Sequence, residues 1–175
     1  SSDTVEVTLD DVRVSDAQRL GEVDQGFRDT MRILDGGRVS IAAMALGLGT
    51  GALEMAVRYA KDRAAFGRPI AEFQAIQWLL ADAKTDLEAA RLLTYRAAWL
   101  ADAGERYTTG ASMAKLFASE IATRVCNDSL QIHGGYGYTR EFDVERHLRD
   151  AKLCEIGEGT SQVQRLVIAK NLLRE

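Results

Sequence analysis

The sequence predicts an all-α fold, an antiparallel four-helix bundle, preceded by one short N-terminal β-strand. Alanine and leucine are abundant and Pro69 is the single proline, a composition that favours helices. Apolar residues recur every three to four positions through long segments, and glycines separate these segments. With 175 residues, the chain is long enough for one domain with a substantial core.

The composition argues against several classes of protein. Hydrophobic residues make up 46% of the chain and charged residues 27%, which is typical of a globular protein. The formal net charge is −4, and Lys and Arg alternate with Asp and Glu, so no nucleic-acid-binding patch is predicted. No apolar stretch reaches the ~20 residues of a membrane helix, and we expect no membrane span. The first residues lack the pattern of a signal peptide.

The cysteines and histidines indicate neither a disulfide framework nor a metal site. Cys126 and Cys154 have no C-x-x-C partner, and we expect buried thiols in a reducing compartment. His133 and His147 are not at the spacing of a zinc-binding motif. No metal is therefore predicted.

Near the N-terminus, residues 5–9 alternate between apolar and polar side chains, which is the period of a half-buried strand. Residues 11–14 extend the pattern. One short strand cannot form a sheet alone, and the chain begins without Met. Either this strand docks on the helices or its sheet lies in an earlier part of a longer protein. We expect residues 25–175 to be the helical domain.

The first predicted helix covers about residues 26–61. One face carries apolar residues at helical spacing: Leu46, Leu53, Val57 and Ala60. Gly47, Gly49 and Gly51 lie inside it, although a glycine costs ~1 kcal/mol in a helix interior. Close packing against a neighbouring helix explains them better than a dinucleotide-binding loop, because no strand precedes them and their spacing is not G-x-G-x-x-G.

Two further long helices are predicted, over about residues 72–103 and 109–132. Each carries an apolar stripe, formed by Ile76, Leu79, Leu80, Ala83 and Leu87 in one and by Met113, Phe117, Ile121 and Val125 in the other. Glycines end both helices. A short helix is expected near residues 144–149, and a last helix begins near Thr160. The three long helices and the last helix are expected to form the bundle.

Glu158 is the candidate catalytic residue, at the start of the last helix. Gly157 and Gly159 flank it, and two glycines let a substrate come close to a carboxylate. Thr160 beside an acidic residue is also an ordinary helix N-cap, and on spacing alone this interpretation is favoured.

Two other groups of residues have both an ordinary and a functional interpretation. Arg63, at the end of the first helix, complements the helix dipole or clamps a phosphate with its guanidinium. Gln131 with Gly134 and Gly135 is a glycine helix stop or a nest of main-chain N–H groups for an anion. The residues alone leave both alternatives open.

Three separate segments together resemble the acyl-CoA dehydrogenase family. Residues 63–70 with Gln74 resemble the family's R-x-x-F-G-x-x-[IL]…Q segment. Residues 131–137 resemble its Q-x-x-G-G-x-G segment, and residues 149–162 resemble the R-D-A-K…E-G-T segment around its catalytic base. Each motif is modest, but the three in this order, together with a helical bundle, are highly specific.

The resemblance covers only the C-terminal part of the family, whose members place a helical domain and a β-barrel domain before it. Residues 1–14 resemble the last strand of that middle β-domain, which implies that residues 1–24 are a residual strand and linker from it and that residues 25–175 are the C-terminal helical domain. The implied cofactor is FAD and the implied substrate is an acyl-CoA. The implied assembly is a homodimer or homotetramer whose subunits share the site, with electron-transfer flavoprotein as electron acceptor, in the bacterial cytoplasm or the mitochondrial matrix.

The resemblance also implies roles for individual residues. Glu158 matches the general base, and Gly159 would lie beside the substrate. Asp35 and Arg38 match a D-x-x-R segment near the acyl-CoA. The residues that match FAD contacts are Arg63, Phe66, Gln74, Gln131, Gly134, Gly135, Thr160 and Gln162.

Three departures from the family pattern bear on the site. In a minority branch the base stands where this chain has Gly37, and because glycine carries no acid, Glu158 is favoured. Gly157 replaces a tyrosine common beside the base, which leaves the acyl preference open. Ala65 replaces a hydroxyl residue of some members, and we expect one flavin hydrogen bond to be lost.

The implied reaction is α,β-dehydrogenation of a fatty or branched-chain acyl-CoA thioester. Glu158 takes the α-proton while a hydride leaves the β-carbon for the flavin, and hydrogen-bond donors, including the Glu158 main-chain N–H, polarise the thioester carbonyl. Two alternatives stay open: an acyl-CoA oxidase-like enzyme that passes electrons to oxygen, and a non-catalytic bundle that mediates oligomerisation.

Overall fold

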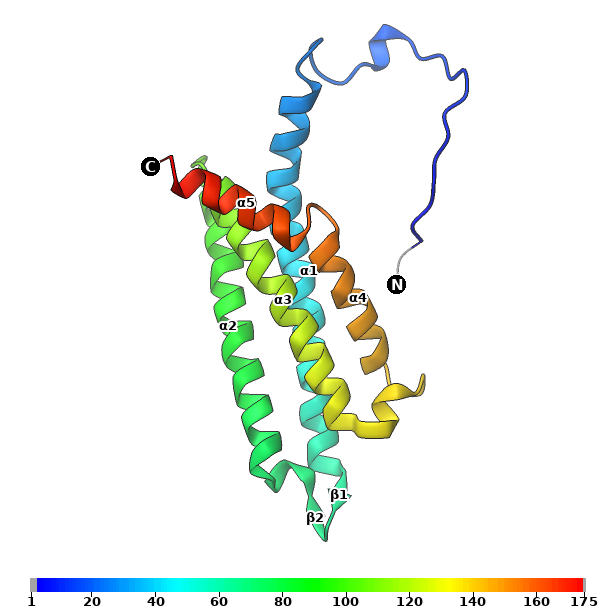
Figure 1. Cartoon of the computed structure of the whole chain (residues 1–175), viewed down its shortest axis with the longest axis vertical. Helices are drawn as coiled ribbons and strands as arrows, with labels where there is room; N and C mark the ends of the chain where they lie inside the picture. Colours follow the sequence, from blue (N-terminus) through cyan, green and yellow to red (C-terminus); the bar gives the residue numbers. More distant parts are fainter. Residues whose placement is uncertain (1–2, 175) are drawn as a thin grey trace.

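The computed structural model describes residues 3–174, and most of them are helical (Figure 1). The α-helices are α1 (Gly26–Asp62), α2 (Gln74–Asp102), α3 (Thr108–His133), α4 (Val144–Ile156) and α5 (Ser161–Leu172). The 3₁₀ helices are η1 (Asp16–Gln18), η2 (Ile70–Glu72) and η3 (Gly134–Tyr138). Two strands, β1 (Ala64–Ala65) and β2 (Arg68–Pro69), form an antiparallel hairpin between α1 and α2.

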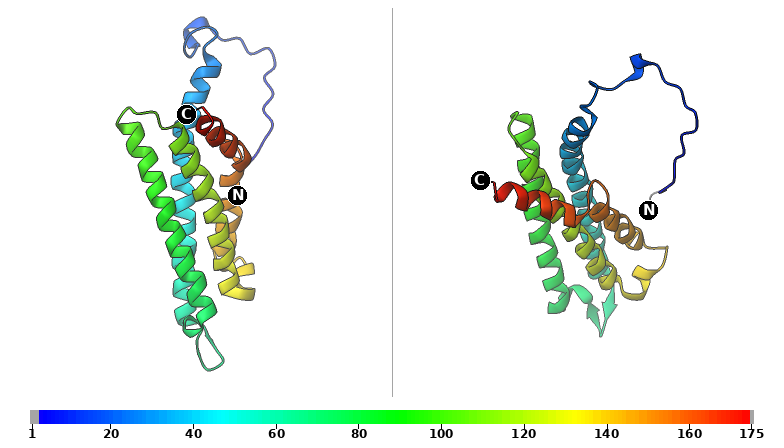
Figure 2. Two further views of the ribbon diagram at one scale, coloured as in Figure 1. Left: turned by 60° about the vertical axis from the view of Figure 1, so that its left-hand side comes forward. Right: turned by 45° about the horizontal axis from the view of Figure 1, so that its top comes forward.

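Four of these helices form an antiparallel bundle, which confirms the predicted fold class. In Figure 1, α1 descends, α2 rises, α3 descends, and α4 returns alongside α1 and α3. The last helix, α5, crosses obliquely over α3 instead of running along the bundle (Figures 1 and 2). The fourth member is therefore α4, which corrects the expectation that the last helix fills this place.

The distribution of apolar side chains explains why α4 occupies the fourth position. It is longer than the sequence predicted, and Val144, Ala151 and Cys154 on its inner face are fully buried. By contrast, α5 buries only Ser161 and Gln164, so it has no apolar stripe with which to fill a bundle position.

Small side chains dominate the core and let the helices approach closely. A Cβ added at Gly49 would lie 2.8 Å from Cδ2 of Leu87 on α2, and one added at Gly51 would lie 3.2 Å from Nε2 of His147 on α4. Close packing is therefore confirmed as the reason for these two glycines. An added Cβ at Gly47 would meet nothing within 4 Å, so the explanation does not extend to it.

Both cysteines are free thiols buried in this core, as the sequence predicts. Burial raises the pKa of the Cys126 thiol to about 12 and also raises the pKa of Cys154. Both thiols are therefore protonated at neutral pH and pack as small apolar side chains.

The predicted N-terminal strand does not form. Residues 3–14 have no regular secondary structure and arc away from the bundle (Figure 2). Val5, Val7 and Leu9 are 74%, 75% and 78% exposed, so the alternating side chains face no partner surface. Within residues 3–174 the only sheet is the β1–β2 hairpin, and a strand does not form without a hydrogen-bonded neighbour. The assignment of residues 1–24 to a separate β-domain stays a prediction.

Among the described helices, α1 is long and apolar enough to cross a membrane by length and composition alone, which the sequence analysis did not expect. The core helix of a bundle passes the same test, so one such helix is weak evidence for a span. Here α1 packs against α2, α3 and α4, and Ala42, Ala45 and Ala52 on it are buried in the core.

Candidate functional site

The predicted site residues fall into two groups at opposite ends of the bundle (Figure 1). The upper site comprises Asp35, Arg38, Glu158, Gly159, Thr160 and Gln162, near the start of α1 and of α5. The lower site comprises Arg63, Phe66, Gln74, Gln131, Gly134 and Gly135, near the end of α1 and of α3. At ~1.5 Å per helical residue, Gly37 and Arg63 on α1 are ~39 Å apart. One chain therefore does not bring all of these residues together.

In the upper site, Glu158 stands in a strained turn between α4 and α5. Its φ is +57°, a left-handed conformation that costs a non-glycine residue ~1 kcal/mol or more. Gly159 follows with a φ of +93°, and a Cβ added there would lie 2.8 Å from Nε2 of Gln164, so this position requires glycine. Backbone strain of this kind concentrates at functional sites, which favours a functional role for Glu158.

The carboxylate of Glu158 lies directly against the main chain of Gly37 on α1. A Cβ added at Gly37 would lie 2.5 Å from Oε2 of Glu158 and 3.0 Å from its Cδ. Any side chain at position 37 would therefore displace the carboxylate. Since Glu158 is exposed in this chain, the place above Gly37 is open to a ligand from outside.

Asp35 and Arg38 form a buried network beside this place. Nη1 of Arg38 donates to Oδ1 of Asp35 at 2.8 Å, and Oγ1 of Thr108 donates to Oδ2 of Asp35 at 2.6 Å. The Arg38 side chain is only 7% exposed. Through Asp35 and Thr108, this network links α1 to the start of α3. The Nε of Arg38 is buried without a hydrogen-bond partner among the described residues.

A pocket of about 340 Å³ adjoins the Asp35–Arg38 pair. Five further basic side chains line it: Arg28, Arg32, Arg106, Lys170 and Arg174. Such a concentration of guanidinium and ammonium groups attracts anionic ligands. The sequence analysis missed this cluster because its members come from α1, the α2–α3 connection, α5 and the residues after α5, and they form no run in the sequence.

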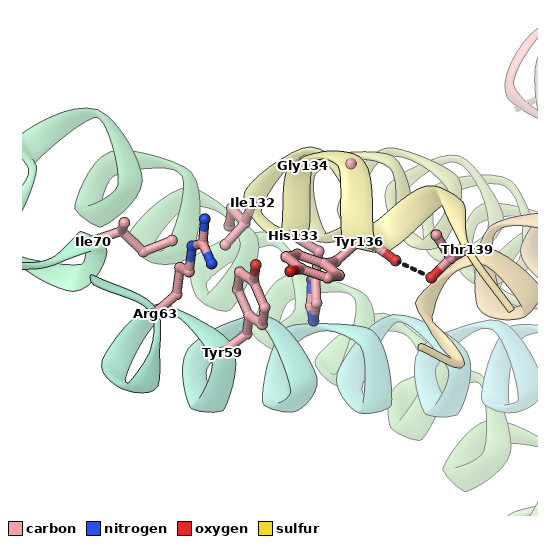
Figure 3. A pocket seen from close by; sticks show the side chains of 9 residues that line it. Tyr59, Arg63, Ile70, Ile132, His133, Gly134, Tyr136 and Thr139 are labelled. Carbon is pink, nitrogen blue, oxygen red and sulfur yellow. Dashed lines mark hydrogen bonds between the residues drawn. The ribbon is translucent and has the colours of Figure 1, made fainter. Parts of the chain in front are cut away.

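The lower site contains a pocket of about 460 Å³ where the ends of α1 and α3 meet (Figure 3). Arg63, Gly134 and Gly135 all line it, so the structure brings together three of the residues predicted to bind FAD. Cζ of Arg63 lies 5.6 Å from the ring centroid of Tyr136. A Cβ added at Gly134 or Gly135 would meet nothing within 4 Å, so a ligand can approach the main chain there.

Aromatic residues that the sequence analysis missed complete the lower pocket. The rings of Tyr59 and His133 stack with centroids 4.3 Å apart, and Tyr136 lies beside them (Figure 3). Tyr59 is one helical turn before Arg63, and His133 directly precedes Gly134, so helical spacing from the predicted residues was an available signal.

Three of the six predicted FAD residues of the lower site do not line the lower pocket. Phe66 lies at the hairpin tip, where it is 97% exposed. Gln74 is the first residue of α2 and is exposed. Gln131 contributes its main-chain oxygen, which accepts the Gly134 N–H where α3 ends.

In the upper site, Thr160 has the ordinary role that its position suggested. The main-chain N–H of Val163 donates to Oγ1 of Thr160 at 3.3 Å, so Thr160 caps α5. Contacts of Thr160 and the exposed Gln162 with FAD stay predictions. Within residues 3–174, no group of three or more His, Cys, Asp or Glu side chains is arranged to hold a metal ion.

Known proteins share this sequence and this arrangement. A family model described as acyl-CoA dehydrogenase, C-terminal domain, matches residues 24–173. The probable acyl-CoA dehydrogenase YngJ of Bacillus subtilis (strain 168) is 55% identical over 173 residues, which are 99% of this chain and 46% of that protein. The caffeyl-CoA reductase-Etf complex subunit CarC of Acetobacterium woodii is 49% identical over 172 residues, which are 98% of this chain and 45% of that protein.

The structure of butyryl-CoA dehydrogenase from Megasphaera elsdenii is similar with a TM-score of 0.92 at 48% identity, over 94% of this chain and 43% of that chain. Bundle and family model together define the class of domain, the C-terminal helical domain of acyl-CoA dehydrogenases. The chain belongs to the acyl-CoA dehydrogenase family. It spans about half the length of the curated relatives it matches.

Proposed function

We propose that the protein containing this chain catalyses flavin-dependent α,β-dehydrogenation of an acyl-CoA thioester, with Glu158 as the general base. The observation that carries the proposal is the placement of the Glu158 carboxylate. A left-handed turn presents it at the surface, against Gly37 and beside the side-chain-free Gly159. The names of the relatives, which include an acyl-CoA dehydrogenase, support the same chemistry.

A carboxylate in this place acts by accepting a proton. Removal of a thioester α-proton requires a base within hydrogen-bond reach, and the carbonyl must be polarised as the proton leaves. No hydrogen bond within residues 3–174 uses the main-chain N–H of Glu158, so this donor is available to the thioester oxygen. Glu158 would thus supply both the base and one oxyanion donor, while Gly159 leaves room for the substrate.

The basic pocket of the upper site suits the CoA part of the substrate. CoA carries phosphate groups, which pair with guanidinium and ammonium groups. Asp35 and Arg38 line this pocket and adjoin Gly37, next to the carboxylate of Glu158. We expect them to lie near the acyl-CoA and to fix the wall of its binding site.

The lower site fits one part of FAD. The guanidinium of Arg63 would pair phosphate oxygens, and the open main chain of Gly134 and Gly135 would lie against them. The rings of Tyr59 and Tyr136 offer flat faces to an aromatic base. When bound, FAD supplies the acceptor for the hydride that leaves the β-carbon. Further contacts are proposed for Phe66, Gln74, Gln131, Thr160 and Gln162.

One FAD cannot use both sites of the same chain. The two sites are ~39 Å apart along α1, whereas the reacting ring must lie beside Glu158. We therefore propose that the lower site of one subunit completes the upper site of another, in a homodimer or homotetramer. Oligomerisation would then be a requirement for flavin binding and turnover.

The proposed electron acceptor is an electron-transfer flavoprotein. CarC, which is 49% identical to this chain, is named as a subunit of a caffeyl-CoA reductase-Etf complex. That name also makes the reverse reaction, reduction of an enoyl-CoA, the second candidate, because the same base and donors serve both directions. Assays of acyl-CoA oxidation and enoyl-CoA reduction with one electron-transfer flavoprotein separate the two.

Glu158→Gln in the full-length protein tests the proposed function. The amide preserves the size of the side chain but cannot accept the α-proton, so we expect flavin content to be kept and turnover to fall by roughly 10²–10⁴-fold. Flavin absorbance reports the cofactor, and its bleaching by acyl-CoA without oxygen reports the reaction. Near-normal bleaching in the variant would contradict the assignment of the base.

A further inference from the structure

The turn that carries Glu158 needs support, because it is both strained and at the surface. Glu158 and Gly159 are consecutive left-handed residues, with φ of +57° and +93°. A surface turn of this kind relaxes unless its surroundings over-determine it. The surroundings here are two fully buried polar side chains, Lys115 and Gln164, which bind the turn from inside the bundle.

Lys115 comes from the first half of α3 and is 0% exposed. Its Nζ donates to the main-chain oxygen of Gly159 at 2.7 Å. Burial lowers the pKa of Lys115, and the nearby charge of Arg38 lowers it further, whereas Glu155 and Glu120 act in the opposite direction. Burying an ammonium group in a helical core is unfavourable, so a lysine here needs a reason other than packing.

Gln164 comes from α5 and is also 0% exposed. Its Nε2 donates to the main-chain oxygen of Gly159 at 2.9 Å and to that of Glu158 at 3.3 Å. Helix capping does not explain these bonds, because Thr160 already caps α5. Oε1 of Gln164 is buried and has no hydrogen-bond partner among residues 3–174, so this side chain binds the turn while one of its own polar atoms stays unsatisfied.

We propose that Lys115 and Gln164 are positioning residues for the reaction. By binding both carbonyls of the turn from the inside, they fix the direction in which Glu158 presents its carboxylate and its main-chain N–H to the substrate. The inference rests on the proposed function, because it requires Glu158 to be the base. Neither side chain touches the substrate; both act through the Glu158–Gly159 backbone.

Lys115→Met and Gln164→Met in the full-length enzyme test this inference. Each variant keeps roughly the volume of the side chain and removes its donor. A base displaced by about 1 Å loses up to ~10²-fold in rate, so we expect kcat to fall by ~10–100-fold. The KM for acyl-CoA and the flavin content are expected to stay unchanged, because neither residue contacts substrate or FAD. Lys115→Arg, which keeps a cationic donor, is expected to recover part of the lost kcat.

Lys84→Met is the matched control. Lys84 is an exposed lysine on α2, which carries no part of the turn, and its Nζ lies 3.8 Å from Oε2 of Glu88. Its loss is expected to leave kcat and KM at wild-type values.

The result for Glu158→Gln separates the two claims. If Glu158→Gln is inactive but Lys115→Met and Gln164→Met turn over normally, the positioning role is wrong and the proposed function stands. If Glu158→Gln is active, the proposed function is wrong, and the inference that depends on it is wrong as well. A third result also overturns the inference. If the Lys115→Met and Gln164→Met variants lose flavin, show a raised KM as well as a lowered kcat, or fail to fold, both side chains are only structural supports.

Discussion

At the scale of single residues, the left-handed glutamate distinguishes this turn from an ordinary helix connection. Glycine or asparagine adopts such a φ with less strain than glutamate. Capping of α5 does not need Glu158 either, because Thr160 supplies the cap. What Glu158 adds is a carboxylate held over Gly37, which is why we assign it a chemical role.

Gly37→Ala is expected to disturb this carboxylate without touching the flavin site. The new methyl carbon would lie 2.5 Å from Oε2 of Glu158, so the carboxylate must move aside. We expect kcat to fall by ~10–100-fold with unchanged flavin content, in steady-state assays of the full-length enzyme. Gly47→Ala, in the same helix with nothing within 4 Å, should leave kcat unchanged. Equal activity of the two variants would refute the described position of the carboxylate.

The sequence identified some site residues and missed others for a physical reason. Glu158 and Arg63 belong to motifs of neighbouring residues, which can be recognised from the sequence. Lys115 lies within the amphipathic pattern of α3, where a lysine normally indicates a solvated face. In the structure it is fully buried and binds the main-chain oxygen of Gly159, which lies 44 residues away in the chain, and this contact leaves no mark in the sequence. Tyr59 joins the lower pocket only because α1 and α3 end side by side.

At the scale of helices and strands, the spacing of apolar residues and the glycines between segments predicted the long helices well. The predicted ranges 26–61, 72–103 and 109–132 agree with α1, α2 and α3 to within two residues at each end. The direction of α5 was missed because the turn before it contains a left-handed φ at Glu158, and the sequence does not reveal such a φ at a non-glycine residue. The strand expected near the N-terminus has the right alternation but no neighbour with which to pair.

Gly49→Ala tests the close approach of the helices. Its new methyl carbon would lie 2.8 Å from Cδ2 of Leu87, so the core must shift. Overpacking of this kind destabilises by ~1–3 kcal/mol, and we expect a lower midpoint in urea or thermal unfolding. Gly47→Ala removes a helix glycine without a clash and should stabilise by ~0.5–1 kcal/mol. A Gly49→Ala protein as stable as the parent would contradict the packing of α1 against α2.

At the scale of the whole molecule, the helical bundle holds two incomplete sites at its opposite ends. The upper site holds the Glu158 carboxylate and a basic pocket, and the lower site holds Arg63 with the double glycine and aromatic rings. Neither end alone has the groups that the proposed reaction requires. The central claim is therefore that each reaction centre takes its upper site from one subunit and its lower site from another.

Co-expression of two inactive full-length chains tests this claim directly. One chain carries Glu158→Gln and keeps Arg63, and the other carries Arg63→Met and keeps Glu158. Random pairing in a symmetric dimer gives one intact centre in each mixed dimer, so about a quarter of wild-type activity per total subunit is expected. If each chain built its own centre, the mixed preparation would show no more activity than the sum of the two variants purified separately, and the account would be wrong.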